Sequence, residues 1–258
     1  MFKPVARRLL ASEVFEQIRS RILRGEMEAG AALPAERALA TLLGVNRNAV
    51  REGLKRLQQA GFVAIQQGGA TRVRDFKRTA GLEILASMVV TDDGTVNTRI
   101  VHGILELRTG LAPLVGRLAA ERAESSHVEA LRAIVERMRE AGGDTSVLVR
   151  LALDFWAEVV AATDNLALEL AFNSLAVSYG SVLEHTHHLM ADEVRAVDDY
   201  AALTTAIAAR RRDEAATLAT RIVTRGERSI GRLTSAVDLL QGRASGRRAK
   251  SARKEKAR

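Results

Sequence analysis

The chain has 258 residues and a net charge of +8, and 47% of its residues are apolar while 27% are charged, as in ordinary folded proteins. It contains no cysteine, which excludes disulfides, thiolate metal sites and cysteine nucleophiles. No apolar run reaches the roughly 18 residues that a transmembrane helix needs, and the first ten residues lack the apolar segment of an export signal. We therefore expect a cytoplasmic protein without a membrane partner.

The charge is unevenly distributed along the chain. Residues 1–78 have a net charge of +8, residues 79–240 have −7, and residues 241–258 have +7. A basic head before an acidic body is typical of a protein whose head binds a polyanion while its body does something else. We expect a head domain, a body domain and a disordered basic tail with these bounds. The tail either adds non-specific affinity for phosphates or is a solubilising extension.

Three helices are predicted in the head. Apolar residues recur at helical spacing over 12–25, 33–44 and 46–61. Only two residues, beginning with Gly44, separate the second helix from Asn46, which is a good N-cap for the third. Two short helices joined by a tight turn that contains glycine form a helix-turn-helix unit.

Two runs with strand character follow the third helix, at residues 62–66 and 71–74. The glycine-containing turn at 67–70 joins them as the tip of a hairpin. The head is therefore predicted to be a winged helix-turn-helix with a small β-wing.

The third helix carries basic and amide side chains at its N-terminal end, where a recognition helix meets the base edges of DNA. Arg47 and Arg51 can each bond guanine in bidentate fashion, and Asn48 can do the same with adenine. Asn46 and the helix N-terminus suit a phosphate, and Gly68 lets the wing backbone approach DNA closely. The head is thus expected to bind double-stranded DNA. The alternative is a solvated basic face without a partner.

The stretch LPAERALATLLGVNRNAVREGLKRLQQAGFVAIQQGGATRV resembles the DNA-binding domain of GntR-family bacterial transcription regulators, and the segment after it resembles the FadR subfamily. The match rests on Leu-Pro-x-Glu-Arg, then Leu-Gly-Val, then Arg followed by Val-Arg-Glu. Asn46, Asn48 and Ala49 replace the Ser or Thr, the Thr, and the Pro or Thr that are usual in the family, so the operator sequence is expected to differ. The resemblance implies DNA contacts from Arg37, Arg47, Arg51 and the wing around Gly68. The full set of expected DNA-binding residues is Arg37, Asn46, Arg47, Asn48, Ala49, Arg51, Gln67 and Gly68.

The body is predicted to be an all-α bundle of six or seven helices, because apolar residues recur at helical spacing almost throughout residues 79–240. Asn97, Asp144 and Asn165 are expected near helix starts, and Ser126 has the spacing of a capping box. The stretch ILELRTGLAPLVGRLAAERA resembles the first long helix of the FCD ligand-sensing domain, with Arg108 in the place of its characteristic arginine. The whole chain is therefore expected to be mainly α.

Many FCD domains bind a metal through an Asp and a His four residues apart and two further His. By this resemblance the first two metal positions are Ala152 and Trp156 here, and neither side chain can ligate a metal. We therefore expect no metal cofactor. A replacement cluster of His185, His187 and His188 is the alternative, although the two adjacent histidines point to different helix faces.

All five aromatic residues of the body lie within 46 residues, from Phe155 to Tyr200. Bulky aromatics in place of metal ligands suit an apolar or amphipathic effector. The FadR resemblance implies long-chain fatty acyl-CoA, with Arg108 at its carboxylate, phosphate or thioester end. The expected ligand-binding residues are Arg108, Trp156, Phe172, Asn173, Tyr179 and Tyr200. The alternative is that the aromatics are simply core and Arg108 is part of an ion pair between helices.

These features together predict a dimeric transcription regulator that binds a palindromic operator and controls fatty-acid metabolism genes in response to fatty acyl-CoA. A GntR regulator of the same type that senses a small organic or sugar acid is the first alternative. A protein that compacts nucleic acid without sequence preference is the second. The sequence has no nucleophile and base set, P-loop or dinucleotide motif, so we do not expect an enzyme.

Overall fold

The computed structural model describes residues 7–66, 69–90, 95–186, 190–229 and 231, and the side chains among them except those of residues 7–9 and 178–186. By its contacts the chain divides into two compact units, Met1–Ile84 and Leu85–Arg258, and each unit is described by itself. The sequence predicts the boundary between the two domains after residue 78. The expected basic tail lies outside the described residues.

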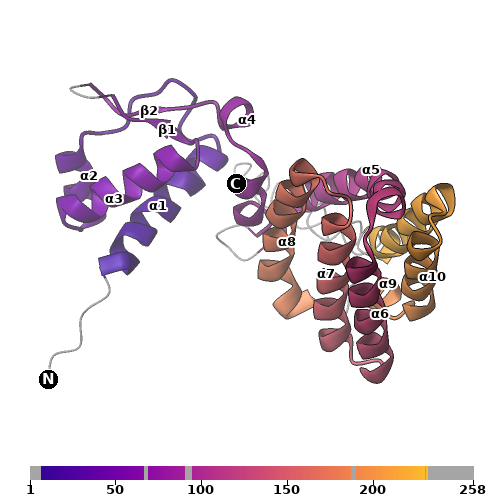
Figure 1. The fold of residues 1–258 in the computed structure, drawn as a ribbon. Coiled ribbons are helices and arrows are strands. Elements are labelled where there is room, and N and C mark those ends of the chain that lie inside the picture. Colours follow the sequence, from indigo (N-terminus) through magenta and orange to yellow (C-terminus); the bar gives the residue numbers. More distant parts are fainter. Residues whose placement is uncertain (1–6, 67–68, 91–94, 187–189, 230, 232–258) are drawn as a thin grey trace, which may run out of the picture. The chain divides into compact units, whose positions relative to one another are not determined.

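The first unit combines three helices with a small antiparallel sheet (Figure 1). Its elements are α1 (Arg7–Leu23), α2 (Glu36–Leu43), α3 (Arg47–Gln59), β1 (Val63–Ala64), β2 (Arg72–Val73) and α4 (Phe76–Thr79). Val63 of β1 lies opposite Val73 of β2, and an isolated bridge pairs Ala32 with Arg72. Both strands are shorter than the runs from which they were predicted. The arrangement confirms the winged helix-turn-helix.

Helices α1 and α3 pack closely because Gly53, at their contact, has no side chain. A Cβ atom at Gly53 would lie 2.7 Å from Cγ1 of Val14. Around this contact Val14 and Ile18 of α1 and Val50 and Leu54 of α3 are buried. Burying each of these side chains contributes roughly 1.5–3 kcal/mol. This core fixes which side of α3 faces solvent.

Two helix starts in the head differ from the prediction. The first helix was predicted from residue 12, but α1 begins at Arg7; the hydroxyl of Ser12 accepts a hydrogen bond from Arg56 Nη1 at 2.9 Å. Helix α2 begins at Glu36, two residues after Pro34. Tertiary packing on α3 extends α1 beyond its local start signal.

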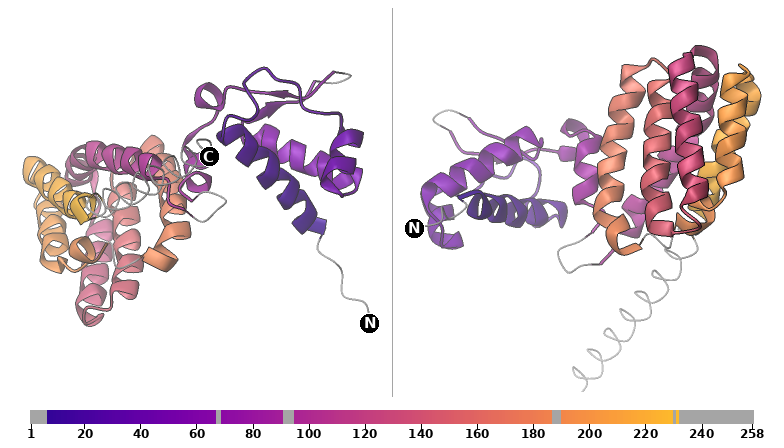
Figure 2. Two further views of the ribbon diagram at one scale, coloured as in Figure 1. Left: turned by 180° about the vertical axis from the view of Figure 1, so that it is seen from behind. Right: turned by 60° about the horizontal axis from the view of Figure 1, so that its bottom comes forward.

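The second unit is a helical bundle (Figure 2) that follows the 3₁₀ helix η1 (Leu82–Ser87). Its helices are α5 (Thr98–Arg122), α6 (Ser125–Glu140), α7 (Thr145–Ala161), α8 (Leu166–Thr186), α9 (Ala191–Val194) and α10 (Val197–Ala208). Residues 212–229 are also helical and are called the last helix below. Within the described part of the chain, no helix is both long enough and apolar enough to cross a membrane.

Side-chain caps begin several of these helices where the sequence indicates. Asn97 accepts a hydrogen bond from the backbone of Ile100 at the start of α5, and Asp144 accepts one from the backbone of Ser146 at the start of α7. Asn165 does the same at the start of α8. The capping box expected at Ser126 is wrong, because α6 already begins at the preceding residue.

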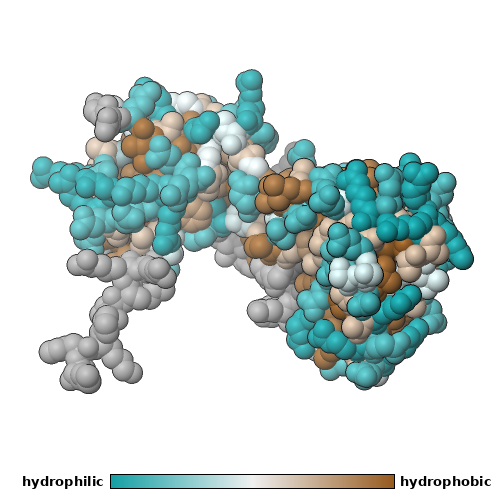
Figure 3. Space-filling model, viewed as in Figure 1, coloured by the Kyte–Doolittle hydropathy of each residue, from teal (hydrophilic) through white to brown (hydrophobic). Residues whose placement is uncertain are grey.

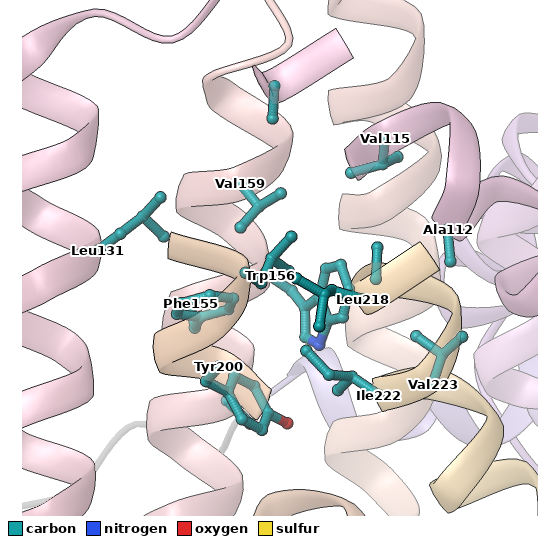
Figure 4. Close-up of a cluster of buried hydrophobic side chains, with 14 of the residues drawn as sticks. Ala112, Val115, Leu131, Phe155, Trp156, Val159, Tyr200, Leu218, Ile222 and Val223 are labelled. Carbon is teal, nitrogen blue, oxygen red and sulfur yellow. The ribbon is translucent and has the colours of Figure 1, made fainter. Parts of the chain in front are cut away.

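The bundle core is centred on α7. The ring centroids of Phe155 and Tyr200 are 4.9 Å apart in an edge-to-face arrangement, and those of Phe155 and Trp156 are 6.1 Å apart. Figure 4 shows the Trp156 indole extending from α7 toward the last helix. That helix lies close to α5, because a Cβ atom at Gly116 would be 2.5 Å from the carbonyl oxygen of Ala215.

Candidate DNA-binding face and effector cavity

Helices α2 and α3 present a basic surface on the side of α3 that does not pack on α1. Its side chains are all exposed, and they come from the start of α2 and from the first turns of α3. We call this surface the recognition face, and it consists of Arg37, Arg47, Asn48, Arg51 and Lys55. The structure thus places four of the predicted DNA contacts of α2 and α3, Arg37, Arg47, Asn48 and Arg51, at exposed positions, and the opposite side of α3 is held by the core.

The turn between α2 and α3 fixes the N-terminal end of the recognition face. Gly44 ends α2 with φ +64°, a backbone conformation that glycine adopts at little cost. Asn46 then caps α3, because its Oδ1 accepts a hydrogen bond from the backbone N–H of Ala49 at 2.9 Å. Ala49 is only 7% exposed and lies on the buried side of α3. Its methyl group therefore does not belong to the recognition face, contrary to the predicted set.

Arg51 of the recognition face is held by a carboxylate of α2. Its Nη2 and Nε donate to the two carboxylate oxygens of Glu36 at 2.8 and 3.2 Å. This hydrogen bond lowers the pKa of Glu36 below its ordinary value. Exposed pairs of this kind are weak, so the contact orients Arg51 without preventing it from exchanging Glu36 for DNA. Gln67 and Gly68, the predicted wing contacts, lie outside the described residues.

A cavity of about 80 Å³ lies inside the helical unit, between α5, α7, α8, α9 and the last helix. Arg108, Trp156 and Phe172 line it, as the sequence predicts. Ala152, one of the two positions at which the family resemblance would place a metal ligand, also lines it. Apart from Arg108, Glu193 and Trp156, every residue of the walls is apolar and without a polar side-chain atom. We call this space the effector cavity.

An ion pair forms the polar end of the effector cavity. Nη1 of Arg108 donates to Oε2 of Glu193 at 2.9 Å, and Nη2 donates to Oε1, so the pair is bidentate. The side chain of Glu193 is 1% exposed and that of Arg108 is 15% exposed. Burial raises the pKa of the Glu193 carboxyl, and the charge of Arg108 partly offsets this effect. Sequence reasoning missed Glu193; the only signal was that a buried arginine needs an anionic partner.

The other predicted ligand-binding residues lie elsewhere. Tyr200 is fully buried against Phe155 and does not line the cavity; burial raises the pKa of its hydroxyl well above 10, and the nearby charge of Glu193 adds to this effect. Asn173 is exposed on the outer side of α8, so it faces away from the cavity. The side chain of Tyr179 lies outside the described residues. Helical spacing alone did not reveal which side of each helix faces inward.

Two buried polar atoms near the cavity are unsatisfied. Among the described residues, neither Nε1 of Trp156 nor the hydroxyl oxygen of Tyr200 makes a hydrogen bond of good geometry, although the two groups are close enough for the indole N–H to lower the pKa of that hydroxyl against the effect of burial. No group of three His, Asp or Glu side chains in the described part of the chain is arranged to hold a metal ion. The side chain of His185, and all of His187 and His188, lie outside that part.

The chain matches the family described as "Bacterial regulatory proteins, gntR family" over residues 10–73 and the FCD domain over residues 103–225. The HTH-type transcriptional regulator Mce2R of Mycobacterium tuberculosis is 42% identical over 205 residues, which cover 80% of this chain and 85% of that protein. A fatty acid metabolism regulator protein of Erwinia tasmaniensis is 31% identical over 170 residues, which cover 66% and 69%.

A solved structure of Lar, which controls the expression of the Listeria monocytogenes agr system, has a TM-score of 0.58 and 14% identity. The match covers 90% of this chain and 100% of that one, and it shows a shared fold. The first matched family segment contains the recognition face, and the second contains both Arg108 and Glu193.

Proposed function

Since the chain belongs to the GntR family of bacterial transcription regulators and carries an FCD domain, we propose that it is a homodimer that binds a palindromic operator in the cytoplasm and responds to a lipid effector. Regulators of this family bind DNA and small-molecule effectors, and they are not enzymes. The observation that carries the proposal is the recognition face, in which Arg47, Asn48 and Arg51 lie on one exposed side of a capped helix.

Dimer formation is supported by an apolar stripe on α8. Leu166, Leu170 and Val177 are 67%, 58% and 66% exposed, and with Asn173 they follow the four-three-four spacing of a coiled-coil seam. In Figure 3, hydrophobic surface interrupts the hydrophilic surface in the region where Figure 1 places α8. Two copies packed through this stripe would be related by a two-fold axis, and a two-fold dimer matches a palindromic operator.

A lipid effector is supported by the walls of the cavity. They are almost entirely apolar, and the relative from Erwinia tasmaniensis is named for fatty acid metabolism. Cavities that hold larger ligands measure roughly 300–1,000 Å³, so a long acyl chain, such as that of fatty acyl-CoA, needs this cavity of about 80 Å³ to widen. A small organic or sugar acid is less well supported, because such a ligand needs more polar groups than these walls offer.

Helix α8 connects the effector to the operator in this proposal. Its inner side, at Phe172 and Leu175, lines the cavity, while its outer side carries the apolar stripe. An acyl chain that widens the cavity displaces α8 and so changes the dimer contact. Operator affinity then changes with effector binding, and by linkage effector affinity changes equally with operator binding.

The test is a gel-shift competition between operator and unrelated DNA. Arg47→Ala should weaken operator binding by about 1–3 kcal/mol, which is roughly fivefold to 150-fold, because it removes a base contact. Arg24→Ala is the control; it removes the same charge from an exposed side chain at the end of α1 that pairs with Glu26. Equal operator affinity of the two variants would contradict the proposed role of α3.

A further inference from the structure

The ion pair at the polar end of the effector cavity is electrically neutral as a unit. The guanidinium of Arg108 keeps its proton at any physiological pH, and both carboxylate oxygens of Glu193 accept N–H donors from it, which is the arrangement of an ionised carboxylate. The cationic side chain that could attract an acidic ligand therefore already has an internal carboxylate bound to it.

Glu193 has little room to leave Arg108. Its side chain is 1% exposed, and the last helix closes over it at Gly226. A Cβ atom at Gly226 would lie 2.0 Å from Oε2 of Glu193, so the carboxylate fills the space that the missing side chain leaves. A ligand carboxylate that displaced Glu193 would leave a buried negative charge without its partner beside a second negative charge.

The rest of the cavity offers a charged ligand no partner. Its other walls are apolar, and Nε1 of Trp156 has almost no accessible surface and lies near the Tyr200 hydroxyl. A carboxylate that entered would therefore lose its hydration without gaining a partner, whereas an uncharged alkyl or acyl chain loses little.

We propose that Glu193 determines the ligand specificity of the effector cavity, which admits an uncharged alkyl or acyl ligand and rejects free carboxylates. The proposal rests on the function proposed above, in that the cavity is the effector site. The internal carboxylate occupies the position that a ligand carboxylate would take on Arg108. The apolar walls bind the chain of the ligand.

The experiment compares 1-octanol with octanoate, which share one chain and differ in charge, by isothermal titration of the full-length protein. The wild type should bind 1-octanol at least on the order of tenfold more tightly than octanoate, because octanoate meets the charge of Glu193. Glu193→Gln removes that charge and should reverse the preference. Asp199→Asn is the matched control; it removes a carboxylate that pairs with Arg221 and Arg225 and does not line the cavity, and it should keep the wild-type preference.

Equal affinity of the wild type for the two ligands, or no binding of either, would overturn the proposal, as would an unchanged preference in Glu193→Gln. If Glu193→Gln does not fold, Glu193→Ala replaces it; this variant also leaves Arg108 without its internal carboxylate, so it should likewise prefer octanoate. Operator affinity is measured in parallel with and without 1-octanol. If 1-octanol binds but leaves operator affinity unchanged, the effector role fails while the specificity of the cavity stands.

Discussion

A methyl group added at Gly226 should separate the last helix from the Arg108–Glu193 pair. The Cβ of Gly226→Ala would lie 2.0 Å from Oε2 of Glu193 and 3.5 Å from Nη1 of Arg108. A glutamate usually avoids such a contact by rotating away. That movement is blocked here, because Glu193 is enclosed and bonded to Arg108 through both oxygens.

The size of the effect follows from the two ways in which the contact can be relieved. Moving the last helix outward is overpacking, which costs about 1–3 kcal/mol. Separating Glu193 from Arg108 breaks a buried pair, which costs about 3–5 kcal/mol. The contact is relieved in the way that costs less free energy. We therefore expect Gly226→Ala to lower the unfolding free energy by roughly 2–3 kcal/mol, at the upper end of the overpacking range because the neighbours are rigid. For a folded unit of this size, such a loss of unfolding free energy lowers Tm by roughly 4–12 °C.

Thermal unfolding followed by circular dichroism measures this loss. Gly103→Ala in α5 is the control, because nothing lies within 4 Å of its Cβ position and alanine stabilises an exposed helix by roughly 0.5–1 kcal/mol relative to glycine. In a Glu193→Ala background, Gly226→Ala should cost little, since the obstructing oxygen is gone. A Tm of Gly226→Ala equal to or above that of the wild type would refute this account of the buried pair.

Other variants test separate parts of the molecule. Asn46→Ala should lower the unfolding free energy of the head by about 1 kcal/mol in urea, while Asn46→Asp, which keeps the cap, should not; equal losses would contradict the capping role. Leu170→Glu, which puts a charge into the α8 stripe, should shift the sedimentation mass from dimer to monomer, and an intact dimer would contradict the interface.

The pKa of Glu193 is raised by burial, so its ionisation removes stability as pH rises above the ordinary glutamate value of 4.5. The Tm of the wild type relative to Glu193→Gln should therefore be highest below that pH and fall above it. A difference in Tm between the two proteins that does not change with pH would contradict a raised pKa of Glu193.

Local signals made the position of the recognition face predictable. Gly44 and Asn46 fix the turn and the start of α3 through their own backbone and side chain, so their roles depend on few distant residues. The period of the apolar stripe then indicates which side of α3 is exposed. The prediction that Ala49 contacts DNA came from the contact positions of the family. Its burial depends on how α3 packs in this core, which the family pattern does not show.

The polar end of the effector cavity was not predictable in the same way. Arg108 and Glu193 are 85 residues apart, and only the fold brings them together. The short helix that carries Glu193 has no distinctive motif, and the glycine that accommodates it comes from a third segment. Tyr200 and Asn173 were assigned to the cavity by spacing, but one is packed behind Phe155 and the other faces outward, because the side that a helix buries depends on its neighbours.

In vitro selection of random DNA sequences by the full-length protein tests the central claim most directly. The account predicts that the wild type enriches one palindromic sequence with two half-sites, and that Arg47→Ala fails to enrich it while Arg24→Ala enriches it normally. Enrichment of no sequence, with an affinity set only by DNA length and salt concentration, would contradict a sequence-reading regulator.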